Sequence, residues 1–170
     1  MKKIFSILVT AVLILLCGCD KIHNPTALTE KISFNAEIDY NNEKYELKVK
    51  IPKNSNIIIE MDSPERLKGS IFEFSNSNLT FNSQGLSYKT SAENLPSVSP
   101  VGFIYYVFSD VAKKSDQVNF QNDEYFISGK IKNYNYKFSF GASGLPIKII
   151  DNKNNITAFI KGVSIDSIAF

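Results

Sequence analysis

The segment SPVGFIYYVFSDVAKK, residues 99–114, decides the fold of this protein. It begins with Ser99 as a helix N-cap and Pro100 at the first helical position, and lysines stand near its end, which is typical of a helix. A helix that is apolar on nearly every side is buried on most sides. The sequence therefore predicts a helix in the hollow of a curved sheet, although a packing helix that is well covered by an ordinary sheet accounts for the same pattern. The apolar residues are Val101, Phe103, Ile104, Tyr105, Tyr106, Val107, Phe108 and Val111.

Strand patterns precede this helix. Residues 33–40 (SFNAEIDY) and 44–51 (KYELKVKI) alternate between apolar and polar side chains, with Asn41 and Asn42 between them. A period of two is the signature of half-buried strands, and the asparagine pair favours a tight hairpin turn. Four shorter segments of the same kind follow at 57–62, 70–74, 79–81 and 86–90. Six short strands in sequence predict an antiparallel meander with one face in water.

Period two resumes after a polar loop at residues 113–124. Turns rich in Asn and Gly separate four further segments, at 125–131, 136–140, 146–150 and 156–165. The expected total is about ten strands. We therefore predict a mainly β (α+β) domain, in which a strongly curved antiparallel sheet or unclosed β-barrel wraps around one apolar helix.

The order of these motifs resembles the lipoprotein-carrier superfamily of LolA-like and LolB-like half-barrels. The motifs are FNAEIDY (34–40), DSPERLKGSIFEF (62–74), LPSVSP (95–100) and SGLPIKI (143–149). The resemblance covers nearly all of the expected domain. It implies an unclosed barrel with a helical lid, whose apolar hollow takes acyl chains or other lipid-like groups. No functional arginine of the carriers can be matched to Arg66, so the resemblance does not extend to transfer of lipoproteins between membranes.

The inward apolar residues of the strands and helix are the candidates for lining such a hollow. A concave apolar pocket binds by removing apolar surface from water, at about 25 cal/mol per Å², and needs no catalytic residue. An inward aromatic side chain is also the ordinary content of a core, because any sheet must bury one face. The candidate lining residues are Phe34, Ile38, Tyr45, Leu47, Val49, Phe72, Phe74, Phe81, Tyr88, Phe103, Ile104, Val107 and Phe108.

The N-terminal segment has the layout of a secretory signal peptide. Lys2 and Lys3 precede an apolar run at residues 4–16, which is interrupted only by Ser6 and Thr10. This run is shorter than the roughly 17 to 25 residues that usually span a bilayer. A permanent transmembrane helix is therefore the weaker interpretation.

The sequence LCGC at residues 16–19 resembles the lipobox of bacterial lipoproteins. Gly18 is the small residue expected before a modified cysteine, whereas cleavage before Cys17 would leave a bulky leucine there. A disulfide between Cys17 and Cys19 would close a very small, strained loop. A zinc site formed with His23 would have only three ligands. Lipidation of Cys19 is therefore the preferred interpretation.

These features predict the organisation and the location of the protein. Residues 1–18 are expected to be a cleaved signal peptide, residues 19–31 the lipidated cysteine and a tether, and residues 32–170 the folded domain. Acyl chains such as palmitate on Cys19 would hold the protein on the outer face of the cytoplasmic membrane. More than one chain is needed for stable anchoring.

Composition argues against nucleic-acid binding and catalysis. Lys and Arg number 19 against 17 Asp and Glu, and loss of the signal peptide would remove two of the lysines, so no basic surplus remains for nucleic acid. The one histidine, His23, lies in the expected tether, and the expected processing leaves no free thiol. The GASG sequence at residues 141–144 lacks the spacing of a serine nucleophile elbow. We expect no enzymatic activity, no cofactor and no metal site.

The predicted function is therefore binding of an apolar or lipidated ligand, either a lipid or a lipoprotein, by a membrane-anchored extracytoplasmic lipoprotein, with a monomer favoured. The alternative is a lipid-tethered module for protein interaction or envelope sensing. It would use the long loops at residues 90–99 and 113–124, the second of which carries Val118 and Phe120. A connected apolar cavity would favour ligand binding, and a filled core beneath an exposed apolar patch would favour the interaction module.

Overall fold

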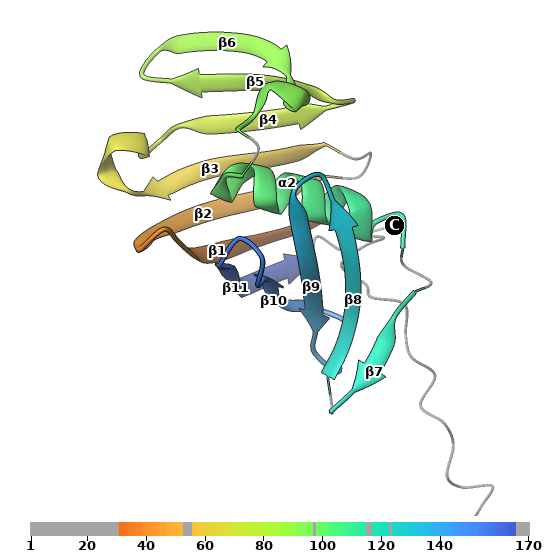
Figure 1. The fold of residues 1–170 in the computed structure, drawn as a ribbon. Coiled ribbons are helices and arrows are strands. Elements are labelled where there is room, and N and C mark those ends of the chain that lie inside the picture. The colour runs from red at the N-terminus through yellow and green to blue at the C-terminus, as the bar shows by residue number, and fades with distance from the viewer. Residues whose placement is uncertain (1–30, 53–55, 97, 115–116, 123, 166–170) are drawn as a thin grey trace, which may run out of the picture.

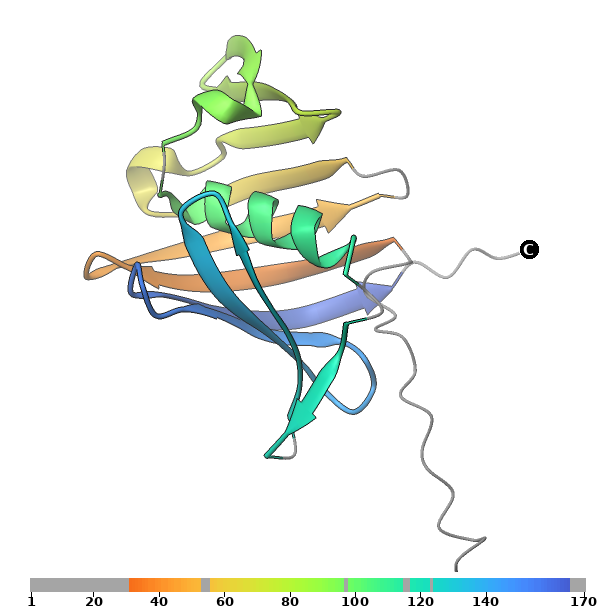
Figure 2. The same cartoon turned by 45° about the vertical axis from the view of Figure 1, so that its right-hand side comes forward.

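The computed structural model describes residues 31–52, 56–96, 98–114, 117–122 and 124–165. These residues form an eleven-stranded antiparallel sheet in the order β6-β5-β4-β3-β2-β1-β11-β10-β9-β8-β7. The sheet is strongly curved and unclosed, and one α-helix lies in its hollow (Figures 1 and 2). This arrangement confirms the predicted fold class. The expected signal peptide, the lipobox and the tether up to residue 30 lie outside the described residues, so they stay predictions.

The six strands before the helix form the predicted meander, in which each strand pairs with the next. The turn between the first two strands contains Asn41 and Asn42 with φ angles of 52° and 61°, a left-handed conformation that asparagine tolerates well. The strands are β1 (Ile32–Tyr40), β2 (Glu43–Ile51), β3 (Ile57–Ser63), β4 (Ile71–Ser75), β5 (Asn78–Ser83) and β6 (Leu86–Ser91). Two short 3-10 helices, η2 (Glu65–Leu67) and η3 (Ala92–Asn94), follow β3 and β6.

Five strands follow the helix, one more than the sequence predicts. They are β7 (Asn119–Gln121), β8 (Glu124–Ile131), β9 (Tyr134–Phe140), β10 (Pro146–Asp151) and β11 (Ile156–Ile165). The additional strand, β7, lies in the segment expected to be a polar loop. It has only three residues and gains its strand conformation by pairing with β8, so its own sequence carries no alternation to detect.

Helix α2 (Pro100–Val111) crosses the hollow of the sheet. The Ser99 side chain caps it by accepting a hydrogen bond from Gly102 N–H at 3.0 Å. Tyr134 fixes the same end from β9, since its hydroxyl accepts from Ser99 N–H at 3.0 Å and donates to Ser99 C=O at 3.2 Å. Burial raises the pKa of Tyr134 to about 12, so the hydroxyl stays a donor at neutral pH.

The other end of the helix is tied to β9 by a polar cluster. Asp110 Oδ2 accepts a hydrogen bond of 2.7 Å from Tyr136 O–H. It also forms an ion pair with Lys114 Nζ, at 2.7 Å. Burial and the neighbouring carboxylate raise the pKa of Tyr136 far above its usual range. A side chain at Gly129 would collide with this cluster, because a Cβ there would lie 2.5 Å from the Tyr136 hydroxyl.

The core lies between the helix and the concave face of the sheet. Phe108 stacks on Phe34 of β1 at 5.1 Å and meets Phe138 of β9 edge to face at 4.9 Å between ring centroids. Aromatic pairs in these geometries add to the stabilisation from buried apolar area. Within the described part of the chain, no helix has the length and apolar character needed to cross a bilayer.

Candidate functional site

Helix α2 covers only part of the concave face. On the side that faces β4, Tyr105 stacks on Phe74, with ring centroids 4.0 Å apart and planes inclined by 12°. Tyr106 O–H donates to Ala92 C=O, just after β6, at 2.7 Å. The next apolar row of the concave face begins at Phe72, which pairs with the fully buried Ile59 of β3 and therefore points to the same side. Phe72 is only half-buried, so the concave face continues beyond the helix as an open surface.

Four apolar side chains form this open surface, which we call the apolar shelf: Phe72, Phe81, Leu86 and Tyr88. The register pairs Phe72 with Phe81 and Phe81 with Tyr88, and it pairs Ser83 with Leu86, so all four share the concave side. The rings of Phe72 and Phe81 are 4.8 Å apart. Leu86 is 78% exposed and Tyr88 is 64% exposed. The apolar shelf is thus built like a core face but is open to solvent.

A tight turn between β5 and β6 places the outer half of the apolar shelf. Gln84 and Gly85 form a two-residue loop with φ angles of 49° and 80°, the left-handed pair that a tight hairpin requires. Loop length fixes hairpin register, and a slip of one residue would move Leu86 and Tyr88 to the convex face.

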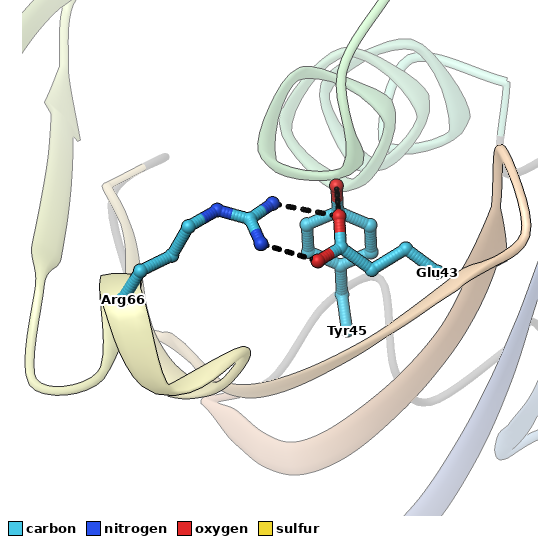
Figure 3. Close-up of polar contacts among 3 residues, drawn as sticks. All are labelled: Glu43, Tyr45 and Arg66. Atoms are coloured by element: carbon cyan, nitrogen blue, oxygen red, sulfur yellow. Dashed lines mark hydrogen bonds and ion pairs between the residues drawn. The ribbon is translucent and has the colours of Figure 1, made fainter.

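Three residues, Glu43, Tyr45 and Arg66, form a charged rim where β2 begins. Arg66 of η2 reaches Glu43 of β2 with both terminal nitrogens, at 2.5 and 2.7 Å, and Tyr45 O–H donates to Glu43 at 2.6 Å (Figure 3). Hydrogen bonding to Arg66 and Tyr45 lowers the pKa of Glu43 to about 2. Bonding to the Glu43 carboxylate in turn raises the pKa of Tyr45. The rim therefore ties η2 to β2 at neutral pH.

The structure distributes the thirteen predicted lining residues over three environments. Phe72, Phe81 and Tyr88 lie on the apolar shelf, and Tyr45 belongs to the charged rim. The remaining nine are at most 3% exposed and belong to one core cluster: Phe34, Ile38, Leu47, Val49, Phe74, Phe103, Ile104, Val107 and Phe108. The prediction that these nine line a ligand cavity stays a prediction, and their packing is that of a core.

Sequence reasoning missed Leu86. The residue stands two positions before Tyr88, so period two puts both on one face, and this signal was available in the sequence. The sequence did not indicate the extent of sheet that α2 covers, because this depends on packing between distant segments. Exposure of Leu86 and Tyr88 follows from that extent.

A depression of about 460 Å³ lies near the β1–β2 turn, away from the apolar shelf but with Glu43 of the charged rim in its lining. Most of its lining is polar: Asp39, Asn41, Asn42, Glu43, Lys44, Asn155 and Thr157, with Tyr40 and Phe159. Its chemistry does not match an apolar ligand, so the apolar shelf is the better candidate. No set of His, Cys, Asp and Glu suited to a metal ion occurs among the described residues.

Taken together, the fold and the shelf define a class of protein: a mainly β domain with a curved, unclosed antiparallel sheet, a helix in its hollow and apolar surface left open on the concave side. No family model and no curated protein sequence matches the chain.

Solved structures with a similar fold include two proteins of very different sequence. An uncharacterized conserved protein from Thermus thermophilus aligns with a TM-score of 0.54 at 10% identity, over 86% of this chain and 85% of that chain. A LolA superfamily protein from Nitrosomonas europaea aligns with a TM-score of 0.46 at 12% identity, over 88% of this chain and 90% of that chain. At such identities the first likeness is one of fold alone.

Proposed function

We propose that this protein binds an apolar or lipidated ligand on the concave face of its sheet, with the apolar shelf as the exposed contact surface. The observation that carries the proposal is the contiguous set of four apolar side chains on the part of the concave face that α2 leaves open. Contiguous exposed apolar surface marks a site of interaction with a ligand, a membrane or another protein. Lipidation of Cys19 and an extracytoplasmic, membrane-anchored location complete the proposal, as the sequence of the N-terminal segment supports.

The apolar shelf suits an acyl chain because its contacts are a row of three aromatic side chains with the aliphatic Leu86 beside them on the same face. Each side chain that a ligand covers adds the free energy of removing apolar area from water, about 25 cal/mol per Å². The apolar shelf is open to solvent, so the side of a bound ligand that faces away from the shelf would be exposed to solvent or covered by another molecule. We therefore expect moderate affinity, with a Kd of about 1 to 100 µM.

Native mass spectrometry of the chain from Lys21 onward, purified without detergent, is the first test. Organic extraction then identifies any copurifying lipid, and a fluorescent fatty acid gives the affinity by titration. Leu86→Asp places a charge at the most exposed side chain of the apolar shelf, and we expect it to weaken fatty-acid binding about tenfold or more, equivalent to about 1.4 kcal/mol.

Phe159→Asp is the matched control, because Phe159 is 43% exposed and lies on the convex face between the inward residues Ala158 and Ile160. We expect this variant to bind the fatty acid as the unaltered protein does. Equal affinities for the two variants, in folded proteins, would remove the apolar shelf from the site.

The second candidate function is a protein-interaction module. The observation that favours it is the tightly filled core beneath an exposed patch, since Leu86 and Tyr88 are the most exposed large apolar residues described. A protein that carries no lipid after purification and does not change mass with added fatty acids would support this function over ligand binding.

A further inference from the structure

Strand β6 offers a free edge for pairing. It ends the sheet on one side, and residues 86–89 are all exposed. The opposite edge strand, β7, has only three residues, and very short edge strands are a common protection against pairing. The six-residue β6 lacks that protection, and it presents exposed Leu86 and Tyr88 beside a single charged residue, Lys89.

The backbone groups of β6 that face this free edge can be assigned. Ala92 N–H donates to Ser77 C=O at 2.8 Å, which marks this pair as hydrogen-bonded in the β5–β6 ladder. Hydrogen-bonded and non-hydrogen-bonded pairs alternate in an antiparallel ladder. The pairs of Thr90, Tyr88 and Leu86 with β5 are therefore hydrogen-bonded as well. The N–H and C=O groups of Ser87 and Lys89 consequently face away from β5.

We propose that β6 pairs antiparallel with β6 of a second copy of this chain, about a twofold axis at Tyr88. Twofold dimers are the commonest oligomers, and their interface uses the same patch on both copies. The outward groups of Ser87 in one copy then meet those of Lys89 in the other. This arrangement satisfies the free edge on both sides with backbone hydrogen bonds.

Charge and strand length select this register among those that the backbone allows. An axis at Lys89 would place two lysines directly opposite each other, which is destabilising in a sheet. An axis at Ser87 would pair fewer β6 residues, because the strand begins at Leu86. An axis at Tyr88 pairs residues 86–90 with their counterparts, sets Lys89 opposite a serine and brings the two tyrosines together as a cross-strand aromatic pair.

The pairing joins the two apolar shelves. A twofold axis perpendicular to the sheet keeps the concave faces of both copies on one side, so Leu86 and Tyr88 of each copy border one continuous apolar trough. Binding of a ligand in this trough rests on the proposed function. The pairing of the two β6 edges does not. The sequence alone favoured a monomer, and this proposal departs from that expectation.

Disulfide cross-linking tests the register. In the full-length chain with Cys17→Ser and Cys19→Ser, we expect Tyr88→Cys to form a disulfide-linked dimer on mild oxidation without ligand. Leu86→Cys is the matched control. Two copies of residue 86 would lie four residues apart along the strands, about 13 Å, which exceeds the roughly 7 Å limit between Cα atoms for a disulfide. We expect it to cross-link at least about tenfold more slowly. Equal rates would overturn the proposal.

Sedimentation in detergent tests the dimer without relying on a cysteine. We expect the full-length chain to be dimeric at about 100 µM and Lys89→Pro to be monomeric, because proline removes an N–H that faces the free edge and leaves the β5–β6 ladder intact. Lys89→Ala keeps that N–H and should stay dimeric. A monomeric full-length chain would overturn the proposal. Loss of fatty-acid binding with an unchanged dimer would instead count against the proposed function.

Discussion

Glu43 shows how single residues organise the edge of the candidate site. Arg66 holds both oxygens of its carboxylate, and Tyr45 donates to the same group. The sequence predicts that Tyr45 faces inward, because residues of β2 alternate. It does not predict the ion pair, because Glu43 and Arg66 are 23 positions apart and meet only when η2 folds back over β2.

Replacement of Glu43 by glutamine should remove a contribution to the free energy of unfolding that depends on pH in the acid range. The pKa of Glu43 is about 2 in the folded protein, below its ordinary value of 4.5, so its carboxylate stabilises the fold fully above pH 4.5. That contribution is lost as the pH falls from 4.5 toward 2. Urea unfolding should therefore show the largest difference between Glu43→Gln and the unaltered protein at pH 7, and little difference at pH 2.

Glu65→Gln provides the control for this prediction. Glu65 is 86% exposed and lies 3.4 Å from Lys68, so its ion pair is weak in water. We expect little difference from the unaltered protein at either pH. A Glu43→Gln difference that did not shrink on acidification would mean that the glutamine acts through packing and not through lost charge.

Helix α2 is the element on which the fold depends, and it was the element best predicted from sequence. Ser99, Pro100 and the all-round apolar surface indicated its start and its burial, and the structure confirms both. Lysines were expected near its end, and Lys113 and Lys114 come shortly after its last residue, Val111, where a turn helps to place Lys114 beside Asp110. The three-residue β7 escaped detection because pairing and not alternation forms it.

The Ser99 cap should contribute measurably to stability. Ser99→Ala removes the acceptor for Gly102 N–H at the start of a helix whose first turn is buried, and we expect a loss of about 1 kcal/mol in the free energy of unfolding by urea. Ser91→Ala removes the corresponding contact to Glu93 N–H, an exposed hydrogen bond of 3.2 Å at the start of η3, and it should cost less than about 0.5 kcal/mol. Similar losses in the two variants would contradict a special role for the α2 cap.

At the scale of the whole molecule, the sequence predicts a curved sheet around a helix, and the structure confirms it. Alternation identifies every described strand except β7, together with its inward side, because burial of one face is a local property of the chain. The boundary between covered and open concave surface is not local. It depends on which strands α2 covers, which explains why nine predicted lining residues lie in the core and only three on the apolar shelf.

The predicted lipid anchor can be tested on the whole protein in cells. Cys19→Ala should release the protein from the membrane fraction or stop its processing, because the acyl chains are the expected attachment. Cys17→Ala is the control and should leave lipidation intact. Fractionation and acyl labelling measure both results. An essential Cys17 with a dispensable Cys19 would place the cleavage site elsewhere.

The pairing of β1 with β11 determines when the eleven-stranded sheet can form as a whole. Glu37 and Lys161, 124 positions apart, form an ion pair across these two neighbouring strands. The strands β1 to β6 and β7 to β10 meet in one sheet only through β11. Contacts of such long sequence separation form slowly, because a large loop must close first. A chain that emerges from a ribosome or a translocation pore N-terminus first therefore cannot complete its sheet until β11 has emerged.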